Sequence, residues 1–234
     1  VSNTKDVGFA FDLDSDRVIL VINGEKKSSD ITLGLGVVKA IKLGIEKFVI
    51  SLDSSLAVEK YIINHGGKVW RSKVGEANVI QAMIENGAEA GGEGSSGGFI
   101  LKKFNMCRDG LLTSGLIASM IDDESIQQDI EFFESFLQIR EKVSVESRLH
   151  DRLIIEISKK IDMKYEINQL DGIKVEIDEN TWSLIRKSNT EDIIRISTES
   201  NDRQLLQKIQ KEMMKNVEEC YEEIKWKENY SNNE

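Results

Sequence analysis

The chain has 234 residues, of which 40% are hydrophobic and 31% charged, with no proline and a formal net charge of -10. This length predicts one or two domains with a core of their own. The acidic balance argues against sequence-independent binding to nucleic acid or to anionic membranes, which both require a positive face. The two cysteines exclude a disulfide scaffold, and the apolar runs are far shorter than the roughly 20 residues of a membrane span. With no signal-like segment at the start of the sequence, we expect a cytoplasmic protein.

Residues 7–22 form an apolar, β-rich run that is interrupted by an acidic cluster at residues 12–17 (DLDSDR). This pattern predicts a strand, a loop and a second strand, followed by a tight turn at Asn23 and Gly24. Helical and strand-like segments then alternate from residue 25 to residue 121. We expect helices over residues 31–43, 54–64, 75–86 and 110–120, and strands over residues 47–52, 68–71 and 99–104. This spacing predicts βαβ units, and so an α/β domain with a mainly parallel sheet.

The order of elements changes after residue 121. Residues 122–144 are acidic and largely helical in pattern, and we expect them to form a connector. An amphipathic helix capped by Ser144 is predicted over residues 145–161, before short strands over residues 172–177, 182–186 and 193–198. Asn201 or Asp202 is expected to cap a long last helix, with a frayed tail at residues 227–234. Residues 145–226 are therefore predicted to form a smaller α+β domain with an antiparallel sheet.

The acidic loop at residues 12–17 is a candidate metal site. Asp12, Asp14 and Asp16 alternate along the chain, so in an extended loop their carboxylates point the same way. Three hard oxygen ligands of this kind suit Mg²⁺. One alternative is a solvated acidic turn. Another is a phosphatase of the haloacid dehalogenase type, with Asp12 as nucleophile and Asp14 as acid/base, but Ser15 and Asp16 then stand where that family has glycine and threonine.

The glycine-rich segment at residues 91–98 (GGEGSSGG) contains a formal G-x-G-x-x-G match. A strand is predicted after it where a dinucleotide-binding fingerprint would have a helix, so the match carries no weight. The segment is either a flexible surface loop or a loop that lets a polyhydroxy ligand approach its backbone. In the second interpretation the Glu93 carboxylate accepts hydrogen bonds from ligand hydroxyls.

Two further segments favour an anionic ligand. Residues 186–191 (RKSNTE), with Arg195 beyond them, combine a guanidinium, hydroxyls and turn N–H groups, which is what a phosphate dianion requires. An ordinary hairpin turn with a surface arginine is the alternative. Lys73, in residues 71–76 (RSKVGE), lies where a strand is predicted to lead into a helix N-terminus. A surface lysine is the simpler interpretation there.

Taken together and in this order, the four segments resemble the motifs of the α-D-phosphohexomutase family, which includes phosphoglucomutase, phosphomannomutase and phosphoglucosamine mutase. The family's metal loop, Asp-Gly-Asp-x-Asp-Arg, is similar to residues 12–17, and its archaeal sugar loop is similar to residues 91–98. Its phosphate loop, Arg-Pro-Ser-Gly-Thr-Glu-Pro, is similar to residues 186–192, and its Lys-Val-Gly turn to residues 73–75. Residues 107–110 (CRDG) also favour the archaeal members.

The resemblance implies a division of the chain and a role for each motif. Residues 1–24 would be a remnant of the family's second domain with its metal loop, residues 25–121 the sugar-binding third domain, and residues 145–226 the phosphate-binding fourth domain. The implied cofactor is Mg²⁺, held by Asp12, Asp14 and Asp16. The implied catalytic residues are Arg17 and Lys73. The implied substrate contacts are made by Glu93, Ser96, Arg186, Ser188, Asn189, Thr190 and Arg195.

The sequence also departs from the family pattern. Family members are about twice as long, and the Thr-x-Ser-His-Asn-Pro loop that carries their phosphoserine is absent from these residues. Gly98 stands where the sugar loop has histidine, and Leu13 where the metal loop has glycine. Asn189 replaces a glycine of the phosphate loop, and Lys187 and Asp192 replace both of its prolines.

The resemblance implies a phosphohexomutase, an isomerase of carbohydrate metabolism. In the complete family enzyme a phosphoserine phosphorylates a hexose 1- or 6-phosphate, and the bisphosphate then returns its other phosphoryl group. This chain would lack the nucleophile and be inactive alone. The alternatives are a non-catalytic binding module for a hexose phosphate and one half of a split enzyme whose partner chain supplies the phosphoserine domain. A Mg²⁺-dependent phosphatase that uses Asp12 ranks last.

Overall fold

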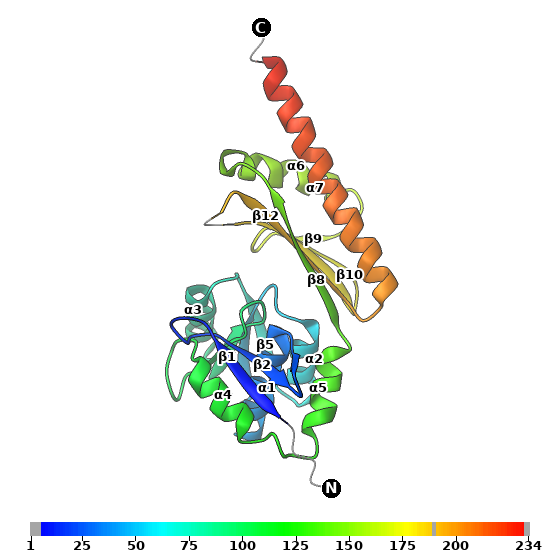
Figure 1. Ribbon diagram of the computed structural model, residues 1–234. Coiled ribbons are helices and arrows are strands. Elements are labelled where there is room, and N and C mark those ends of the chain that lie inside the picture. The colour runs from blue at the N-terminus through cyan, green and yellow to red at the C-terminus, as the bar shows by residue number, and fades with distance from the viewer. Residues whose placement is uncertain (1–5, 189–190, 232–234) are drawn as a thin grey trace. The chain divides into compact units, whose positions relative to one another are not determined.

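The computed structural model describes residues 6–188 and 191–231, and the chain divides into two compact units, Val1–Ser135 and Phe136–Glu234 (Figure 1). The first unit contains a small antiparallel sheet and a larger mixed α/β sheet, and the second contains one antiparallel sheet with two long helices. Among the described residues, no helix combines the length and the apolar character that a membrane crossing requires.

The first unit begins with the predicted strand, loop and strand. β1 (Val7–Phe11), β2 (Val18–Ile22) and β3 (Glu25–Lys26) form an antiparallel sheet in that order. Phe11 pairs with Val18, so residues 12–17 form the loop that closes the β1–β2 ladder. This hairpin lies against α1 (Ser29–Lys42) and α4 (Gly110–Ala118). The acidic loop therefore belongs to the same unit as the α/β sheet.

The larger sheet has the strand order β5-β4-β6-β7. β4 (Lys47–Ser51) runs parallel to both β5 (Lys68–Ser72) and β6 (Ala90–Glu93), whereas β6 and β7 (Gly98–Leu101) are antiparallel. Two of these three pairings are parallel, as the alternating pattern predicted. The connecting helices are α1, α2 (Leu56–Asn64) and α3 (Glu76–Asn86), and Ser28, Ser55 and Asp109 cap α1, α2 and α4 with their side chains.

The mixed sheet is covered on both faces. Phe99 packs against α1, where the absence of a side chain at Gly36 makes room for its ring. The next residue, Ile100, points to the other face and packs with Val79 and Met83 of α3. β6 is fully buried, although we expected a loop at residues 91–98. Sheet pairing on both sides of β6 has overridden the weak strand propensity of glycine.

The segment expected to form a connector is divided between the two units. α5 (Ile126–Glu134) belongs to the first unit, where Phe133 fills the space beside Gly34 of α1 and Tyr61 donates a hydrogen bond to Asp129. β8 (Leu137–Ser144) is an edge strand of the second unit's sheet and pairs with β12 over its full length. The acidic composition of this stretch conceals a strand whose paired residues lie 49 to 63 positions further along the chain.

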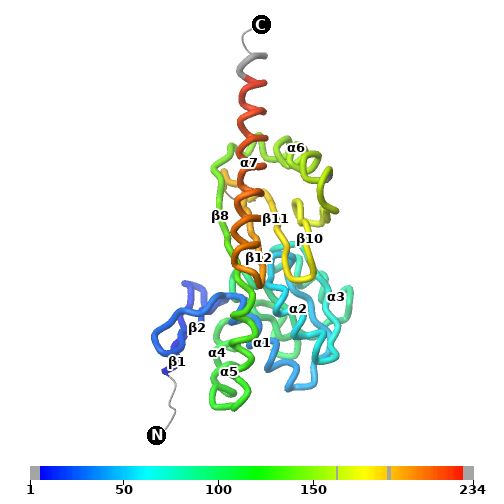
Figure 2. Tube along the Cα trace, turned by 90° about the vertical axis from the view of Figure 1, so that its right-hand side faces the viewer, coloured from blue at the N-terminus to red at the C-terminus, as the bar shows by residue number. Residues whose placement is uncertain are grey.

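The second unit is an antiparallel sheet in the order β8-β12-β11-β10-β9. Its other strands are β9 (Ile167–Asn168), β10 (Ile173–Asp178), β11 (Thr181–Lys187) and β12 (Ile193–Ser200). Apolar side chains of β10, β11 and β12 form one core with those of α6 (His150–Asp162) and α7 (Arg203–Ser231). This arrangement is the predicted α+β class. α7 lies along the sheet and continues past its end (Figures 1 and 2).

Both helices of this unit differ from expectation at one end. α6 begins at His150, because Ser144 remains in β8 opposite Ile193 and a short 3-10 turn (η1, Ser147–Leu149) follows. α7 continues to Ser231, although we expected fraying after residue 226. Glu228 accepts two hydrogen bonds from Arg148, at 3.0 and 2.9 Å, which ties this last part of the helix to the turn before α6.

Candidate functional site

The acidic loop of the first unit gathers its carboxylates. Asp12, Asp14 and Asp16 each place one carboxylate oxygen within 4.8 Å of the others. A turn closed by the Ser15 N–H on the Asp12 carbonyl, with Ser15 at a φ of 58°, bends the loop so that alternate side chains converge. Carboxylate oxygens are the ligands that a hard divalent cation prefers, so these residues fit Mg²⁺.

Cationic side chains partly neutralise this loop. Arg17 donates hydrogen bonds from its Nε to Asp12 and Asp16, and its backbone N–H donates to Asp12. Although desolvation raises the pKa of Asp12, these hydrogen bonds hold it below its usual value. The pKa of Asp16 is raised, first by desolvation and then by repulsion from Asp12 and Asp14, which outweigh the attraction of Arg108. The loop thus holds more negative charge than Arg17 alone compensates.

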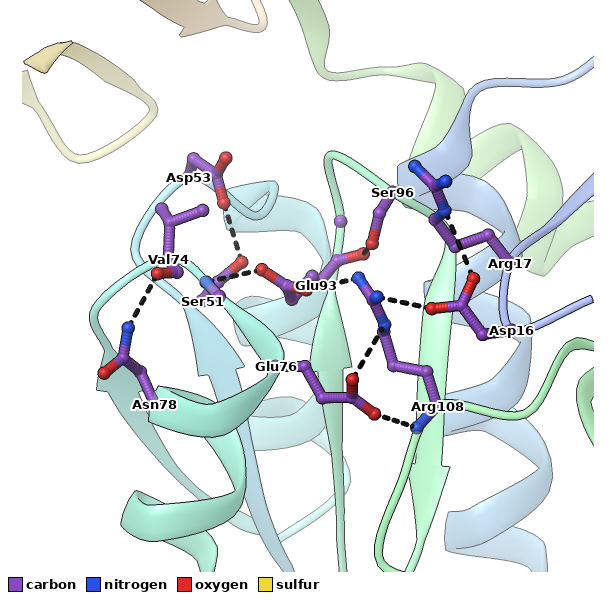
Figure 3. A network of polar contacts seen from close by, with 12 residues as sticks. Asp16, Arg17, Ser51, Asp53, Val74, Glu76, Asn78, Glu93, Ser96 and Arg108 are labelled. Carbon is purple, nitrogen blue, oxygen red and sulfur yellow. Dashed lines mark hydrogen bonds and ion pairs between the residues drawn. The ribbon is translucent and has the colours of Figure 1, made fainter. Parts of the chain in front are cut away.

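Glu93, at the end of β6, is almost completely buried, with 3% of its surface exposed. Its Oε1 accepts a hydrogen bond from the Gly75 N–H at 2.6 Å, and its Oε2 accepts one from Arg108 at 2.8 Å (Figure 3). Desolvation raises the pKa of Glu93, and these two hydrogen bonds oppose the shift. The buried carboxylate is therefore held in place from two sides.

The glycines around Glu93 allow the chain to pack closely against itself. A Cβ on Gly92 would lie 2.2 Å from the carbonyl oxygen of Gly98, and one on Gly94 would lie 1.8 Å from a carboxylate oxygen of Asp30. The Gly94 N–H also donates to Ser54 Oγ at 2.8 Å. The segment is thus a buried β-hairpin whose turn is fixed against the first turn of α1 and the β4–α2 turn.

Ser96 and Lys73 lie near Glu93 in the first unit. Ser96 is half-buried in the β6–β7 turn, and its N–H and Oγ both donate to the Glu93 carbonyl, at 3.3 and 3.4 Å. Lys73 is exposed in the β5–α3 loop, two residues before Gly75. Asn78 donates to the Val74 carbonyl at 2.8 Å and so fixes this loop (Figure 3). The structure therefore places the loops of Lys73, Ser96 and Glu93 side by side.

Arg108 is a residue that the sequence did not single out for a role. Its guanidinium donates to Glu93 and also to Asp16, which joins the β6–β7 hairpin to the acidic loop (Figure 3). Its backbone N–H donates to Glu76 at 2.7 Å, and its Nε lies 3.7 Å from the same carboxylate. A lone arginine ahead of the helix cap Asp109 carries no local signal, because its acidic partners are 15 to 92 positions away.

The phosphate-loop candidate lies in the second unit, where β11 turns into β12. Arg186 and Arg195 are direct cross-strand neighbours, and Lys142 of β8 is directly opposite Arg195. Directly opposed residues share one face of a sheet, so these three cations form a row across three strands. Lys142 is an addition to the sequence-based set, missed because its segment was expected to be a connector.

The described part of the turn is held by hydrogen bonds. The Ser188 N–H donates to the Ile193 carbonyl at 3.0 Å, and its Oγ accepts from the Glu191 N–H at 3.3 Å. Glu191 also accepts a hydrogen bond from Arg195. The predicted contacts Asn189 and Thr190 lie outside the described residues.

Lys187 and Asp192, at the two ends of the turn, both contact the segment around the start of α6. The Lys187 ammonium lies 2.5 Å from Asp151, and Asp192 accepts from the Ser147 N–H at 3.0 Å and from the Ser147 hydroxyl. Hydrogen bonds from these partners lower the pKa of both Asp151 and Asp192. Lys187 and Asp192, which stand where the family pattern has prolines, thus anchor the two ends of this loop.

Family models match most of the chain. The model described as "Phosphoglucomutase/phosphomannomutase, alpha/beta/alpha domain III" matches residues 29–136, and the C-terminal domain model of the same family matches residues 143–216. These two ranges contain Glu93, Arg108 and the row of Arg186 and Arg195. The acidic loop lies ahead of the first range.

Curated relatives match over nearly the whole chain. A probable phosphoglucosamine mutase of Methanopyrus kandleri is 30% identical over 225 residues, which are 94% of this chain and 49% of the relative. A phosphoglucosamine mutase of Methanococcus maripaludis is 30% identical over 211 residues, 88% of this chain and 47% of the relative. The chain therefore spans about half the length of the curated relatives it matches.

Solved structures share the fold. A phosphoglucomutase/phosphomannomutase family protein from Burkholderia thailandensis superposes with a TM-score of 0.77 at 21% identity, over 92% of this chain and 47% of that protein. Aspergillus fumigatus N-acetylphosphoglucosamine mutase in complex with GlcNAc-6P and magnesium gives a TM-score of 0.65 at 15% identity, over 92% and 49%.

Proposed function

Because the chain belongs to the phosphoglucomutase/phosphomannomutase family and carries its third and C-terminal domains, we propose that it supplies the sugar-binding and phosphate-binding parts of a phosphohexomutase. Its ligand would be a hexose phosphate, and glucosamine phosphate is the first to test because the matched relatives are named phosphoglucosamine mutases. The observation that carries the proposal is the cluster in which Arg108 joins Asp16 of the acidic loop to Glu93 of the glycine-rich hairpin.

We propose Asp12, Asp14 and Asp16 as the residues that would hold Mg²⁺. Their clustered oxygens support this assignment, and so does the charge of the loop, which exceeds what Arg17 compensates. When bound, the cation would supply charge neutralisation for a transferring phosphoryl group. Arg17, paired with Asp12 and half-exposed, is proposed to face that group.

Glu93 and Ser96 are proposed to contact sugar hydroxyls. A carboxylate oxygen has two lone pairs, so Glu93 retains acceptor capacity beside the Gly75 N–H. Lys73, exposed on the adjoining loop, is proposed to contact an anionic group of the ligand. The hydrogen bond from the Gly75 N–H pre-organises Glu93, which lowers the ordering cost of binding.

Arg186, Ser188 and Arg195, with Asn189 and Thr190, are proposed to bind the phosphate that does not react. Two guanidinium groups on adjacent strands can each offer parallel N–H donors to a dianion. Lys142 would add a third positive charge to the same row. Holding one phosphate in this way restricts the orientations that the bound sugar can take.

We propose that residues 1–24 are the last part of the family's second domain. The match to the third-domain model begins only at residue 29, which supports a boundary near β3. These 234 residues contain no Thr-x-Ser-His-Asn-Pro segment. We therefore expect the purified chain to bind a hexose phosphate but not to interconvert glucosamine 6-phosphate and glucosamine 1-phosphate. A segment that carries the phosphoserine, in the same protein or on a separate chain, is the corresponding proposed partner.

Isothermal titration with glucosamine 6-phosphate in Mg²⁺ buffer tests the proposal. We expect binding by the wild-type chain and a loss of about tenfold in affinity for Glu93→Gln, since a hydrogen bond to a charged group is removed. Glu85→Gln, an exposed glutamate of α3, is the matched control and should bind as the wild type does. No binding by the folded wild-type chain, or equal binding by both variants, would overturn the proposal.

A further inference from the structure

The Arg108 side chain contacts both the acidic loop and the glycine-rich hairpin of the first unit. It lies in the loop before α4, and its guanidinium hydrogen-bonds Asp16 of residues 12–17 and Glu93 of residues 91–98 (Figure 3). The two acids come from segments 77 positions apart in the sequence, since Asp16 and Glu93 differ by that number. Asp16 is a proposed ligand of the cation, and Glu93 is a proposed acceptor for the sugar hydroxyls.

The guanidinium occupies the position of a counter-ion for the acidic loop. It donates a hydrogen bond to Asp16, and one carboxylate oxygen of Asp16 lies within 4.8 Å of one from Asp12 and one from Asp14. A divalent cation on the same three carboxylates would neutralise Asp16 in place of Arg108. Two cations that share one carboxylate repel each other, so the ion and the guanidinium compete for it.

The bridging arrangement of Arg108 also leaves one donor unsatisfied. Among the described residues, its buried Nε has no hydrogen-bond acceptor, and Glu76 is 3.7 Å from it. A buried N–H without an acceptor destabilises the structure. An arrangement of Arg108 in which this N–H reaches an acceptor or water removes that penalty. The bridge between Asp16 and Glu93 is therefore a contact that a competing ligand can displace.

The space that Arg108 occupies exists because residue 98 is glycine. A Cβ at Gly98 would lie 2.2 Å from Arg108 Cδ and 2.9 Å from its Cγ. Gly98 is not among the glycines with positive φ, so alanine fits its backbone conformation. Gly98→Ala therefore moves the arginine without deleting it.

We propose that Arg108 is a positioning residue that bridges Asp16 and Glu93 before ligands bind, and that a divalent cation and a sugar displace the same bridge. This inference rests on the proposed function. The bridged and released arrangements are two states, and both ligands prefer the released one. Each ligand therefore raises the affinity for the other, by thermodynamic linkage.

The first test measures binding of Mn²⁺ alone, as a spectroscopic substitute for Mg²⁺, by electron paramagnetic resonance. We expect Arg108→Gln and Gly98→Ala each to bind Mn²⁺ about tenfold more tightly than the wild type, because a competing positive charge has left Asp16. Arg203→Gln, which changes an exposed arginine at the start of α7, is the control and should not change the affinity. A merely structural role for Arg108 predicts weaker binding in the variants.

The second test measures the coupling between the ligands. Titration of Mn²⁺ with and without saturating glucosamine 6-phosphate should show an affinity gain of about fivefold or more in the wild type. That gain should fall in Arg108→Gln and in Gly98→Ala. Equal Mn²⁺ affinity or equal coupling in wild type and both variants would overturn the inference and leave the proposed function standing. Absence of Mn²⁺ binding in all four proteins would overturn the proposed metal site as well.

Discussion

The candidate binding segments of the first and second units hold their side chains in different ways. In the first unit, Glu93 is buried and is joined to Asp16 through Arg108, so three segments distant in the sequence form one hydrogen-bonded cluster. In the second unit, Arg186 and Arg195 are neighbours on two strands of one hairpin, and the chain folds them together locally. The Asp16–Arg108–Glu93 cluster forms only when the tertiary structure is complete. The pairing of Arg186 with Arg195 requires only that β11 and β12 pair in the correct register.

This difference follows from the charges involved. Buried carboxylates are stable only with donors on both oxygens, so the acidic cluster has to be built into the core with its partners. Cations on long side chains keep their hydration at the surface until an anion arrives. We therefore expect changes in the first unit to alter stability and binding together, and changes in the second unit to alter binding with little effect on stability.

Gly92→Ala should have the largest effect. The new Cβ would meet the Gly98 carbonyl oxygen at 2.2 Å and Leu33 at 2.6 Å, so the β6–β7 hairpin that carries Glu93 has to shift. We expect a loss of about 2 kcal/mol in the free energy of unfolding of the first unit, measured by urea titration.

The matched control is Gly115→Ala in the same unit. Gly115 lies inside α4 with open space around its Cα, so alanine there should be neutral or stabilising by about 0.5–1 kcal/mol. Equal stabilities for the two variants would contradict the view that the glycine-rich hairpin is part of the core.

Arg186→Ala tests the other side of the comparison. Removing one guanidinium from the row should weaken binding of glucosamine 6-phosphate about tenfold, since a charge-assisted pair of donors is lost. The free energy of unfolding should stay within about 0.5 kcal/mol of the wild type. Lys211→Ala, which changes an exposed cation of α7 outside the row, should leave ligand affinity unchanged in the same calorimetric titration. A large loss of stability in Arg186→Ala would remove the distinction between the two units.

Lys142→Gln should give a smaller change. Its ammonium is about half-exposed and lies opposite Arg195, so it contributes charge to the row without a fixed hydrogen bond. We expect a threefold loss in phosphate affinity, about the size of a screened surface interaction. Lys208→Gln on α7 is the control. Identical affinities at low ionic strength for wild type and Lys142→Gln would exclude Lys142 from the row.

A pH dependence of stability should be the smallest effect. Hydrogen bonds from Ser147 hold the pKa of Asp192 below its usual value of 3.8, so the ionised form stabilises the folded turn. That contribution is present above the unfolded-state pKa and is lost as the pH falls through the lower folded-state pKa. Urea unfolding should show Asp192→Asn less stable than the wild type at pH 7, with the difference shrinking as the pH falls below 3.8. A difference that persists in acid would mean that the charge of Asp192 is not what stabilises the turn.

Local patterns in the sequence predicted those parts of the site that depend on neighbouring residues. The alternation of Asp12, Asp14 and Asp16 and the strand-turn-strand around Arg186 needed only local geometry. β6 was missed, because its glycines have weak strand propensity and are required by close contacts with β4 and β7. Arg108 could not be found either, since nothing near it in the sequence is its partner. Both the strand conformation of β6 and the contacts of Arg108 depend on residues distant in the sequence, and a single sequence does not reveal such contacts.

The two residues that stand in place of the family's prolines give the phosphate turn a property of their own. A proline ring would fix its backbone angle in any buffer. Here Lys187 and Asp192 anchor the ends of the turn through Asp151 and Ser147 instead. Contacts of this kind weaken as added salt shortens the Debye length, about 10 Å at 0.1 M, and as acid removes the carboxylate charge. The stiffness of this turn is therefore set by the surrounding solution, through ionic strength and proton concentration.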